Sequence, residues 1–369
     1  MMNRKIKVTL ISSTLIIILT VVLYHIITNT TDTSTTDNNK IAFSLYFTKD
    51  MTSGINKGKI ISYQDSTIKN KISTTGIDNS IIFYDENTLH SSDTETMFAY
   101  DENNLQTYKK KRKFESMSIS SFKFGSDIVH INNSGYGDDN SYNTTLYNAT
   151  KNNQLIIKDI ISNVGHSNNT LFLMSDRDEN NRMTIYTVTS KNDQLTPAKK
   201  LYFQGTNNGE SHIIGDLIYY NESLLFVEDD GIGKVNFVMI NLPDNKITKK
   251  KLLSYKTSDE ISELTPYSNT NSVFLFKENC YFLDATGILH QVDLKTLTLT
   301  KQTLANDTTN RYIDIKKDSL YLFEENDTNN LLKEYTLKSD GTLHLKSTTN
   351  VMFPLTISGM YLSNFKVKK

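Results

Sequence analysis

The best-spaced oxygen ligands of the sequence lie in the stretch SDRDENNRM, where Asp176, Asp178 and Asn180 occupy alternate positions. Carboxylate and amide oxygens at this spacing can wrap around a hard cation, so the three residues are candidate calcium ligands. The EF-hand calcium loop also needs a glycine at its sixth position and a glutamate at its twelfth, and this stretch has neither. The alternative is the charged tip of a hairpin. Calcium is the one cofactor that the sequence brings into consideration.

Two polar stretches are longer than a simple turn requires, namely NNSGYGDDNSYN (132–143) and QGTNNGESH (204–212). Long loops on a rigid scaffold are where binding residues concentrate. We therefore expect any ligand-binding face to include these loops. The side chains in them that can contact a ligand are Tyr136, Asp138, Asp139, Glu210 and His212.

Motifs of known catalytic sites are absent from the sequence. Seven histidines are dispersed without the H-E-x-x-H spacing of a zinc site, and no G-x-S-x-G nucleophile elbow occurs. The single cysteine, Cys280, excludes an internal disulfide and stands beside Tyr281 and Phe282, which predicts a buried packing role. Catalytic residues therefore stay unassigned.

The charge balance argues against nucleic acid as the main partner. The formal net charge is -1, whereas a phosphate-binding domain normally carries a basic excess. Two basic clusters stand out, YKKKRKF (108–114) and TKKKLL (248–253). We interpret both as exposed edges of outer strands, where lysines prevent edge-to-edge association. The alternative is a patch for an anionic wall polymer or lipid headgroups.

The N-terminus has the pattern of a membrane anchor. Residues 1–7 include Arg4, Lys5 and Lys7, and the run VTLISSTLIIILTVVLYHII covers residues 8–27. At 1.5 Å per residue this helix would measure about 30 Å, which matches a bilayer core. The preceding charges predict a cytoplasmic tail at 1–7 and an outer location for the remainder.

A flexible tether is predicted after the anchor. Residues 28–39, TNTTDTSTTDNN, contain nothing that a core could bury. A cleaved signal peptide is the alternative to an uncleaved signal-anchor, but its shorter apolar region and its A-x-A-like site are not seen. An outer location together with a single cysteine is typical of Gram-positive bacteria, so we expect a single-pass protein of the cell membrane with most of the chain extracellular.

After residue 40 one sequence pattern recurs along the chain. It consists of a short run of β-branched and aromatic residues, a polar turn and a second run. Examples are SIIFYDEN (80–87), DLIYYNESLLFVEDDG (216–231) and SVFLFKENCYFLDATG (272–287). This is the signature of β-hairpins, and the Asn, Asp and Gly turn residues accept left-handed backbone conformations. Runs that are apolar on both sides, such as IIFY and VFLF, indicate sheets covered on both faces.

In each repeat, the apolar residue after the second turn marks the repeat length. The seven positions are Ile68, Leu105, Leu155, Leu195, Ile247, Leu297 and Leu343, with spacings of 37, 50, 40, 52, 50 and 46 residues. These are lengths of a four-stranded propeller blade. We predict an all-β propeller of about seven blades over residues 40–369, with six or eight blades, or a β-sandwich pair, as alternatives. The unpartnered strands IAFSLYF (41–47) and MYLSNFKV (360–367) are expected to close the ring together.

One copy of the repeat carries a family resemblance. The segment YFLDATGILHQVDLKTLTL resembles the repeat of bacterial β-propellers of the quinoprotein-like and YVTN-like kind, in which an Asp-x-x-Thr-Gly motif marks the turn between inner strands. The matching residues are Asp284, Thr286 and Gly287, with a spacing one residue shorter. The tryptophan typical of quinoprotein repeats is missing throughout. The resemblance implies the propeller fold and does not imply a quinone cofactor.

The sequence favours a binding or scaffolding module over an enzyme. In this reading a membrane-anchored extracytoplasmic propeller contacts a protein, a peptide or a cell-envelope polymer. The alternative is a propeller-type hydrolase or lyase that acts on an extracellular polymer. Converging acid, base or metal groups near the propeller axis, with shifted pKa values, would favour the enzyme.

Overall fold

The computed structural model describes residues 41–49, 57–101, 104–110, 117–191, 194–205, 210–266, 271–305, 310–325 and 329–368. The chain divides into two units, Met1–Lys40 and Ile41–Lys369. The predicted anchor (8–27) and tether (28–39) fall in the first unit and lie outside the described residues. Among the residues that are described, no helix has the length and apolar character needed to cross a membrane.

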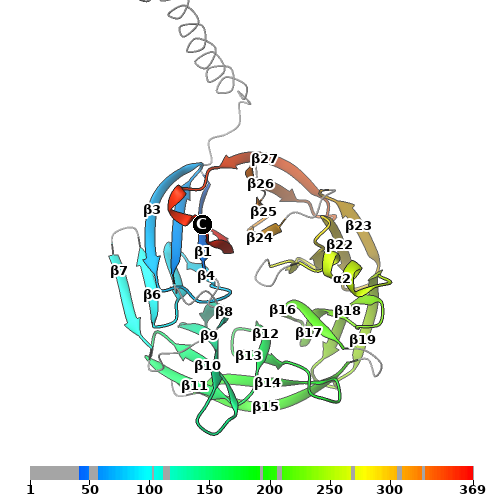
Figure 1. Cartoon of the computed structure of the whole chain (residues 1–369). Coiled ribbons are helices and arrows are strands. Elements are labelled where there is room, and N and C mark those ends of the chain that lie inside the picture. Colours follow the sequence, from blue (N-terminus) through cyan, green and yellow to red (C-terminus); the bar gives the residue numbers. More distant parts are fainter. Residues whose placement is uncertain are drawn as a thin grey trace, which may run out of the picture. The chain divides into compact units, whose positions relative to one another are not determined.

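The second unit is a ring of seven sheets, each of four strands, arranged as blades around a common axis (Figure 1). Blade 1 consists of β28 (Tyr361–Val367), β1 (Ala42–Thr48), β2 (Gly58–Gln64) and β3 (Thr67–Thr74). Blade 2 consists of β4 (Ile82–Asp85), β5 (Thr88–Ser92), β6 (Thr96–Asp101) and β7 (Asn104–Lys109). Blade 3 consists of β8 (Met117–Phe124), β9 (Asp127–Tyr136), β10 (Tyr142–Asn148) and β11 (Asn153–Ile157).

The remaining blades follow in chain order, again from the inner to the outer strand. Blade 4 consists of β12 (Ile161–His166), β13 (Thr170–Ser175), β14 (Arg182–Lys191) and β15 (Gln194–Gln204). Blade 5 consists of β16 (His212–Tyr220), β17 (Ser223–Asp229), β18 (Lys234–Asn241) and β19 (Ile247–Ser254). Blade 6 consists of β20 (Val273–Phe276), β21 (Asn279–Leu283), β22 (Ile288–Asp293) and β23 (Leu299–Thr303). Blade 7 consists of β24 (Asn310–Lys316), β25 (Ser319–Glu325), β26 (Asn330–Leu337) and β27 (Leu343–Val351).

The seven-blade prediction is confirmed. Six of the seven apolar residues that mark the repeat lie on the outermost strand of their blade, and Leu297 lies two residues before the outermost strand β23. The predicted ring closure is also confirmed. Strand β28 pairs antiparallel with β1, in a register that joins Phe43 to Val367 and Thr48 to Tyr361. Both ends of the propeller chain therefore complete a single blade.

The local sequence explains the strands and their turns. Strand β17 is buried at every position because blades cover both of its faces. The hairpin turn that precedes it consists of Asn221 and Glu222, which both have a positive φ, at 45° and 58°. Two consecutive residues with positive φ form a type I′ turn, whose twist matches that of the flanking strands.

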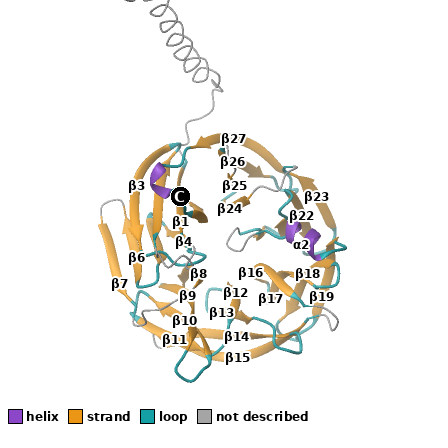
Figure 2. Ribbon diagram, in the orientation of Figure 1, coloured by secondary structure: helices purple, strands orange, loops and turns teal. Residues whose placement is uncertain are grey.

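The two faces of the ring differ. The turns from first to second and from third to fourth strand share one face, which we call the tight-turn face. The turns from second to third strand and the connections between blades share the opposite face, which we call the loop face. The helices α2 (Ser258–Leu264) and η2 (Leu355–Ile357) both lie in connections on the loop face (Figure 2).

The chain enters the ring on the tight-turn face. The backbone N–H of Asp65, in the β2–β3 turn, donates to the Ile41 carbonyl at 2.7 Å. The N–H of Lys368 donates to the Ala42 carbonyl at 2.7 Å, so the C-terminal end lies at the same place. Ile41 and Lys368 therefore both lie at the tight-turn face.

Hydrophobic packing joins neighbouring blades with one exception. Six clusters of buried apolar side chains fill the interfaces of blades 1–2, 3–4, 4–5, 5–6, 6–7 and 7–1. Among the described residues, none of these clusters spans blades 2 and 3. Polar side chains take that position, as described below.

Candidate functional site

An ion pair joins two of the sequence-predicted segments on the loop face. The guanidinium of Arg177 lies 2.6 Å from the Glu210 carboxylate and 3.2 Å from Nδ1 of His212. Arg177 belongs to the β13–β14 turn of blade 4, Glu210 lies in the connection between blades 4 and 5, and His212 begins β16 of blade 5. The sequence placed Glu210 and His212 in one loop but did not identify Arg177 as their partner. Residues 206–209 of that loop lie outside the described residues.

The predicted calcium ligands form the turn that carries Arg177. One carboxylate oxygen of Asp178 accepts hydrogen bonds from the backbone N–H groups of Asn180 and Arg182, at 2.9 and 3.0 Å. Its other oxygen lies 3.1 Å from the Arg182 guanidinium. The Asp176 carboxylate accepts from the Arg177 N–H at 2.9 Å. These contacts shape a hairpin tip, and the calcium site stays a prediction. No cluster of three or more His, Cys, Asp or Glu side chains suited to a metal ion occurs in the described ranges.

The other predicted binding residues lie at the β9–β10 turn of blade 3. Tyr136 is 75% exposed, and its ring packs edge-on against Tyr142 at 5.3 Å. Asp139 lies 2.6 Å from Lys158, whose hydrogen bond is the largest influence that lowers the pKa of this carboxyl. Asp138 is exposed in the same turn. The predicted residues therefore form two groups on the loop face, one at blade 3 and one between blades 4 and 5.

The loop face also contains a pocket of about 300 Å³ between blades 7, 1 and 2. Asn79, Asn310, Glu325, Tyr361 and Ser363 contribute to its lining. Burial raises the pKa of Glu325, against the opposing effect of a hydrogen bond with Asn310. The sequence did not predict this pocket, because its residues come from chain segments that meet only when the ring closes.

Charged side chains also lie near the axis of the ring. Asp216 lies on the innermost strand of blade 5, where desolvation by the surrounding protein raises its pKa to about 6. The hydrogen bond from the Val164 N–H and the charge of Lys366 oppose this rise. Lys366, on the inner strand of blade 1, also lies 3.2 Å from Asp314. A carboxyl that titrates near pH 6 is suited to proton transfer, although an ionic network can produce the same shift.

The residues that carry the family resemblance form a buried turn in blade 6. One oxygen of Asp284 accepts from the backbone N–H of Thr286 and Ile288, each at 3.0 Å, and from the Thr286 hydroxyl at 2.7 Å. The other oxygen accepts from Nε2 of His290 at 2.8 Å. Gly287 has a φ of 88°, which suits glycine at this position. The network stabilises the turn between the second and third strands.

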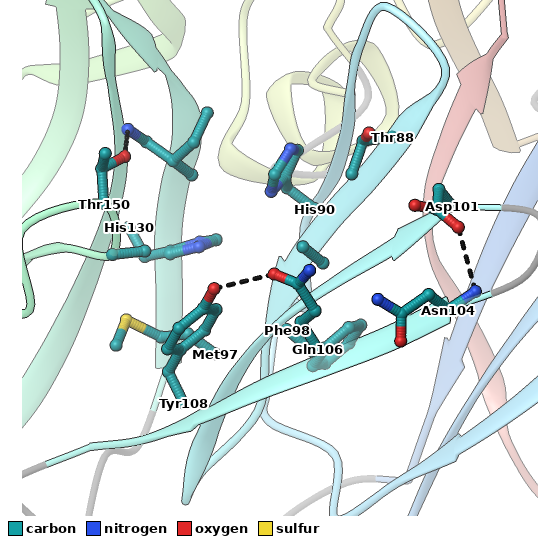
Figure 3. Close-up of a pocket in the computed structure, with 13 residues that line it drawn as sticks. Thr88, His90, Met97, Phe98, Asp101, Asn104, Gln106, Tyr108, His130 and Thr150 are labelled. Atoms are coloured by element: carbon teal, nitrogen blue, oxygen red, sulfur yellow. Dashed lines mark hydrogen bonds between the residues drawn. The ribbon is translucent and has the colours of Figure 1, made fainter.

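A cleft of about 310 Å³ opens between blades 2 and 3, and we call it the blade 2–3 cleft (Figure 3). Its lining side chains come from β5, β6 and β7 of blade 2, from β9 of blade 3 and from the β10–β11 turn. The residues with polar side chains are Thr88, His90, Asp101, Asn104, Gln106, Tyr108, His130 and Thr150, and Met97, Phe98, Ala99, Ile128 and Ala149 complete the lining. The cleft therefore lies at the one interface that no hydrophobic cluster fills.

Local contacts hold the polar groups of the cleft in place. The Tyr108 hydroxyl donates to the side-chain oxygen of Gln106 at 2.9 Å (Figure 3). Nδ1 of His130 lies 2.9 Å from the Ser121 hydroxyl. The His90 ring stacks on Phe83 with the ring centroids 5.1 Å apart. Burial lowers the pKa of both histidines, so both rings are neutral at pH 7.

The basic clusters occupy the positions expected of outer strands, with one exception. Strand β19, which contains Lys249, Lys250 and Lys251, is the outermost strand of blade 5. Tyr108 and Lys109 lie on exposed β7, the outermost strand of blade 2, and residues 111–114 lie outside the described residues. Lys110 is instead buried at the blade 2–3 interface, where its ammonium donates to the Asp93 carbonyl at 2.5 Å and lies over the Tyr147 ring.

A match to a protein-family model identifies the family of this chain. The model of the YycP β-propeller domain matches residues 23–368, which is almost the whole chain. The chain is a member of the YycP β-propeller family. This agrees with the resemblance to bacterial propellers drawn from Asp284, Thr286 and Gly287. No curated protein matches the sequence.

This YycP-family chain resembles solved structures at low sequence identity. Apo AztD from Citrobacter koseri is 9% identical, with a TM-score of 0.53, and the match covers 89% of this chain and 98% of AztD. BamB from Moraxella catarrhalis is 8% identical, with a TM-score of 0.47, over 83% of this chain and 82% of BamB. At such identities the AztD likeness establishes the propeller fold and no shared ligand.

Proposed function

We propose that this protein is a membrane-anchored extracytoplasmic propeller that presents its loop face as a binding surface for a protein, a peptide or a cell-envelope polymer. The observation that carries the proposal is the entry of the chain at Ile41 on the tight-turn face. A tether that begins there leaves the opposite face free. That face carries the Arg177–Glu210 ion pair, the exposed Tyr136 and the pocket lined by Glu325.

The anchor and the outer location are tested by thiol labelling in intact cells. Cys280 is 2% exposed and burial raises its pKa to about 12, so the natural thiol will not react at neutral pH. We expect Thr300→Cys, on the exposed outer strand of blade 6, to react with a membrane-impermeant maleimide. Asn3→Cys should react only after lysis. Labelling of Asn3→Cys in intact cells, or of Thr300→Cys only after lysis, would contradict the proposed orientation.

The binding surface is tested by placing a photoreactive phenylalanine analogue on either face of the ring. Tyr136 and Tyr361 are suitable loop-face positions, because they are 75% and 39% exposed. Asp340, exposed in the β26–β27 turn, is the matched position on the tight-turn face. We expect cross-linked adducts in cells from the two loop-face positions and none from Asp340. Equal adducts from both faces would refute a dedicated binding face.

The hydrolase or lyase alternative depends on Asp216. A carboxyl with a pKa of about 6 can donate and accept protons near neutral pH. If the enzyme hypothesis is right, Asp216→Asn will abolish turnover of a polymer while leaving the melting temperature almost unchanged. Binding without turnover by the unaltered protein would remove this alternative.

A further inference from the structure

We infer that the blade 2–3 cleft is a binding site for a neutral, polyhydroxylated ligand, namely a sugar residue, free or within a glycan. The inference is independent of the loop-face proposal, because the cleft opens beside the opposite, tight-turn face. Thr88 follows the β4–β5 turn, Asn104 begins β7, and Ala149 and Thr150 lie in the β10–β11 turn. All of these turns belong to the tight-turn face.

The interface between blades 2 and 3 is built differently from the other six. Blades in this ring adhere by burying aliphatic and aromatic side chains, the packing that contributes most to fold stability. Strand β7 is exposed at every position. Leu105 on its outer side is 47% exposed, and Tyr108 on its cleft side is 39% exposed. Blade 2 therefore covers blade 3 incompletely and leaves polar groups of both blades beside a space.

Buried polar groups continue the lining beneath the cleft. Asn132 lies two residues beyond His130 on β9, so alternation places both side chains on the face turned toward blade 2. Asn132 is 0% exposed, and neither atom of its amide has a hydrogen-bond partner. The hydroxyl groups of Ser92 and Ser118 are likewise buried without partners at this interface. Such groups are costly unless water or a ligand satisfies them.

The polar side chains of the lining offer both hydrogen-bond donors and acceptors. Gln106 uses its side-chain oxygen to accept from Tyr108, which leaves its NH₂ group to donate to a ligand. A neutral imidazole at His90 combines a donor with an acceptor, whereas Nδ1 of His130 is already bonded to Ser121 and only its Nε2 remains. The Asn104 amide and the Thr88 and Thr150 hydroxyls add further groups that both donate and accept. Hydroxyl groups of a sugar, which also donate and accept, complement this set.

The same lining disfavours charged and apolar ligands. Among the described residues that line the cleft there is no Lys or Arg, and the carboxylate of Asp101 would repel an anion. Asp101 accepts from the Asn104 N–H at 2.9 Å, which reduces its capacity to bind a cation. An apolar ligand would remove water from the amides of Asn104 and Gln106 and from the His90 imidazole without replacing their hydrogen bonds. The Tyr108 ring offers the flat apolar surface that a sugar ring can cover. The volume of about 310 Å³ is at the lower end for ligand pockets and suits a single ring.

The test is a titration of the purified full-length protein by isothermal calorimetry. The probes are N-acetylglucosamine, its trimer, maltotriose, a trigalacturonate and a glucosamine trimer. We expect saturable binding of a neutral sugar, with the monomer and trimer of N-acetylglucosamine distinguishing a free sugar from a glycan. Binding by none of the neutral probes, or tighter binding of the acidic or basic trimer, would overturn the inference.

A pair of variants on one strand locates the binding. Gln106→Leu removes the free amide donor and should weaken binding about tenfold, which corresponds to about one hydrogen bond. Thr107→Val is the matched control, because its side chain points to the opposite face of β7, and it should leave the affinity unchanged. Equal affinity of both variants would place the sugar elsewhere and overturn the inference. The loop-face cross-links are unaffected by this outcome, so the two proposals fail separately.

Discussion

Removal of residues 355–369 will unfold the whole propeller rather than fray one blade. The deletion takes away β28, whose Leu362, Phe365 and Val367 are at most 3% exposed and pack in the cluster between blades 7 and 1. Burying three such side chains contributes about 5–9 kcal/mol, and a typical domain has a total stability of only about 5–15 kcal/mol. We expect no cooperative melting transition, as measured by calorimetry and by near-ultraviolet circular dichroism.

Two point substitutions on the same strand provide the controls for the deletion. Phe365→Ala should cost about 3–5 kcal/mol, because it opens a cavity in a packed core. Tyr361→Phe, at a position that is 39% exposed, removes a hydroxyl whose bond to Asp78 is 3.4 Å long and should cost under about 1 kcal/mol. A cooperative transition at an unchanged temperature after the deletion would mean that the ring does not depend on its closure.

The second large effect is expected at Asp284. Asp284→Ala leaves the N–H groups of Thr286 and Ile288 and Nε2 of His290 without their acceptor, and the His290 ring is 1% exposed. Unsatisfied buried donors cost about 1–3 kcal/mol each, so we expect a loss of about 3 kcal/mol or more. Urea unfolding followed by tyrosine fluorescence will measure it.

Asp178→Ala is the matched control for Asp284. Asp178 makes the same pair of backbone contacts, to the N–H groups of Asn180 and Arg182, in the corresponding turn of blade 4. Its side chain is 35% exposed, so water can replace the lost acceptor. We expect a loss under about 1 kcal/mol. Equal losses for the two variants would show that the turn geometry matters and the burial does not.

The pH dependence of stability should depend on Asp284. Burial by itself would raise the pKa of Asp284, but the hydrogen bonds from His290, Thr286 and Ile288 hold it below the ordinary value of 3.8. Because the pKa is lower in the folded state, the carboxylate contributes stability above pH 4 and loses that contribution as the pH falls further. Urea midpoints of Asp284→Ala should therefore fall less between pH 5 and pH 3 than those of the unaltered protein. A parallel decline of both proteins would exclude Asp284 as the cause.

Much of the fold could be predicted because blades repeat a local pattern. Ile68, Leu155 and Ile247 recur after polar turns, and this spacing marked the outermost strands correctly. The types of residue in the turns predicted the backbone conformation less well than the apolar spacing predicted the strands. Lys277 and Lys317 adopt positive φ values of 54° and 55° in turns between first and second strands, although lysine has no preference for that conformation. There the strand pairing on both sides determines the backbone of the turn.

The candidate site was predicted less well, because its residues meet only in space. The loops with Tyr136 and Glu210 were identified from their length, but only the packing of blades 4 and 5 brings Arg177 next to Glu210. The blade 2–3 cleft did leave a trace in the sequence. His130 and Asn132 replace apolar residues at alternate positions of a strand that is otherwise suited to burial. Without knowing which strand faces them, that pattern could not be distinguished from exposure to solvent.

The sequence by itself determined that strands form, where they turn and roughly how long each repeat is, because these depend on alternation and on turn residues that are close in the chain. Only the tertiary structure decided which blade faces lack apolar partners, which charges meet, and from which face the chain leaves the ring. Those properties depend on contacts between blades. Each blade contributes half of such an interface, and neither half alone specifies what the other will present.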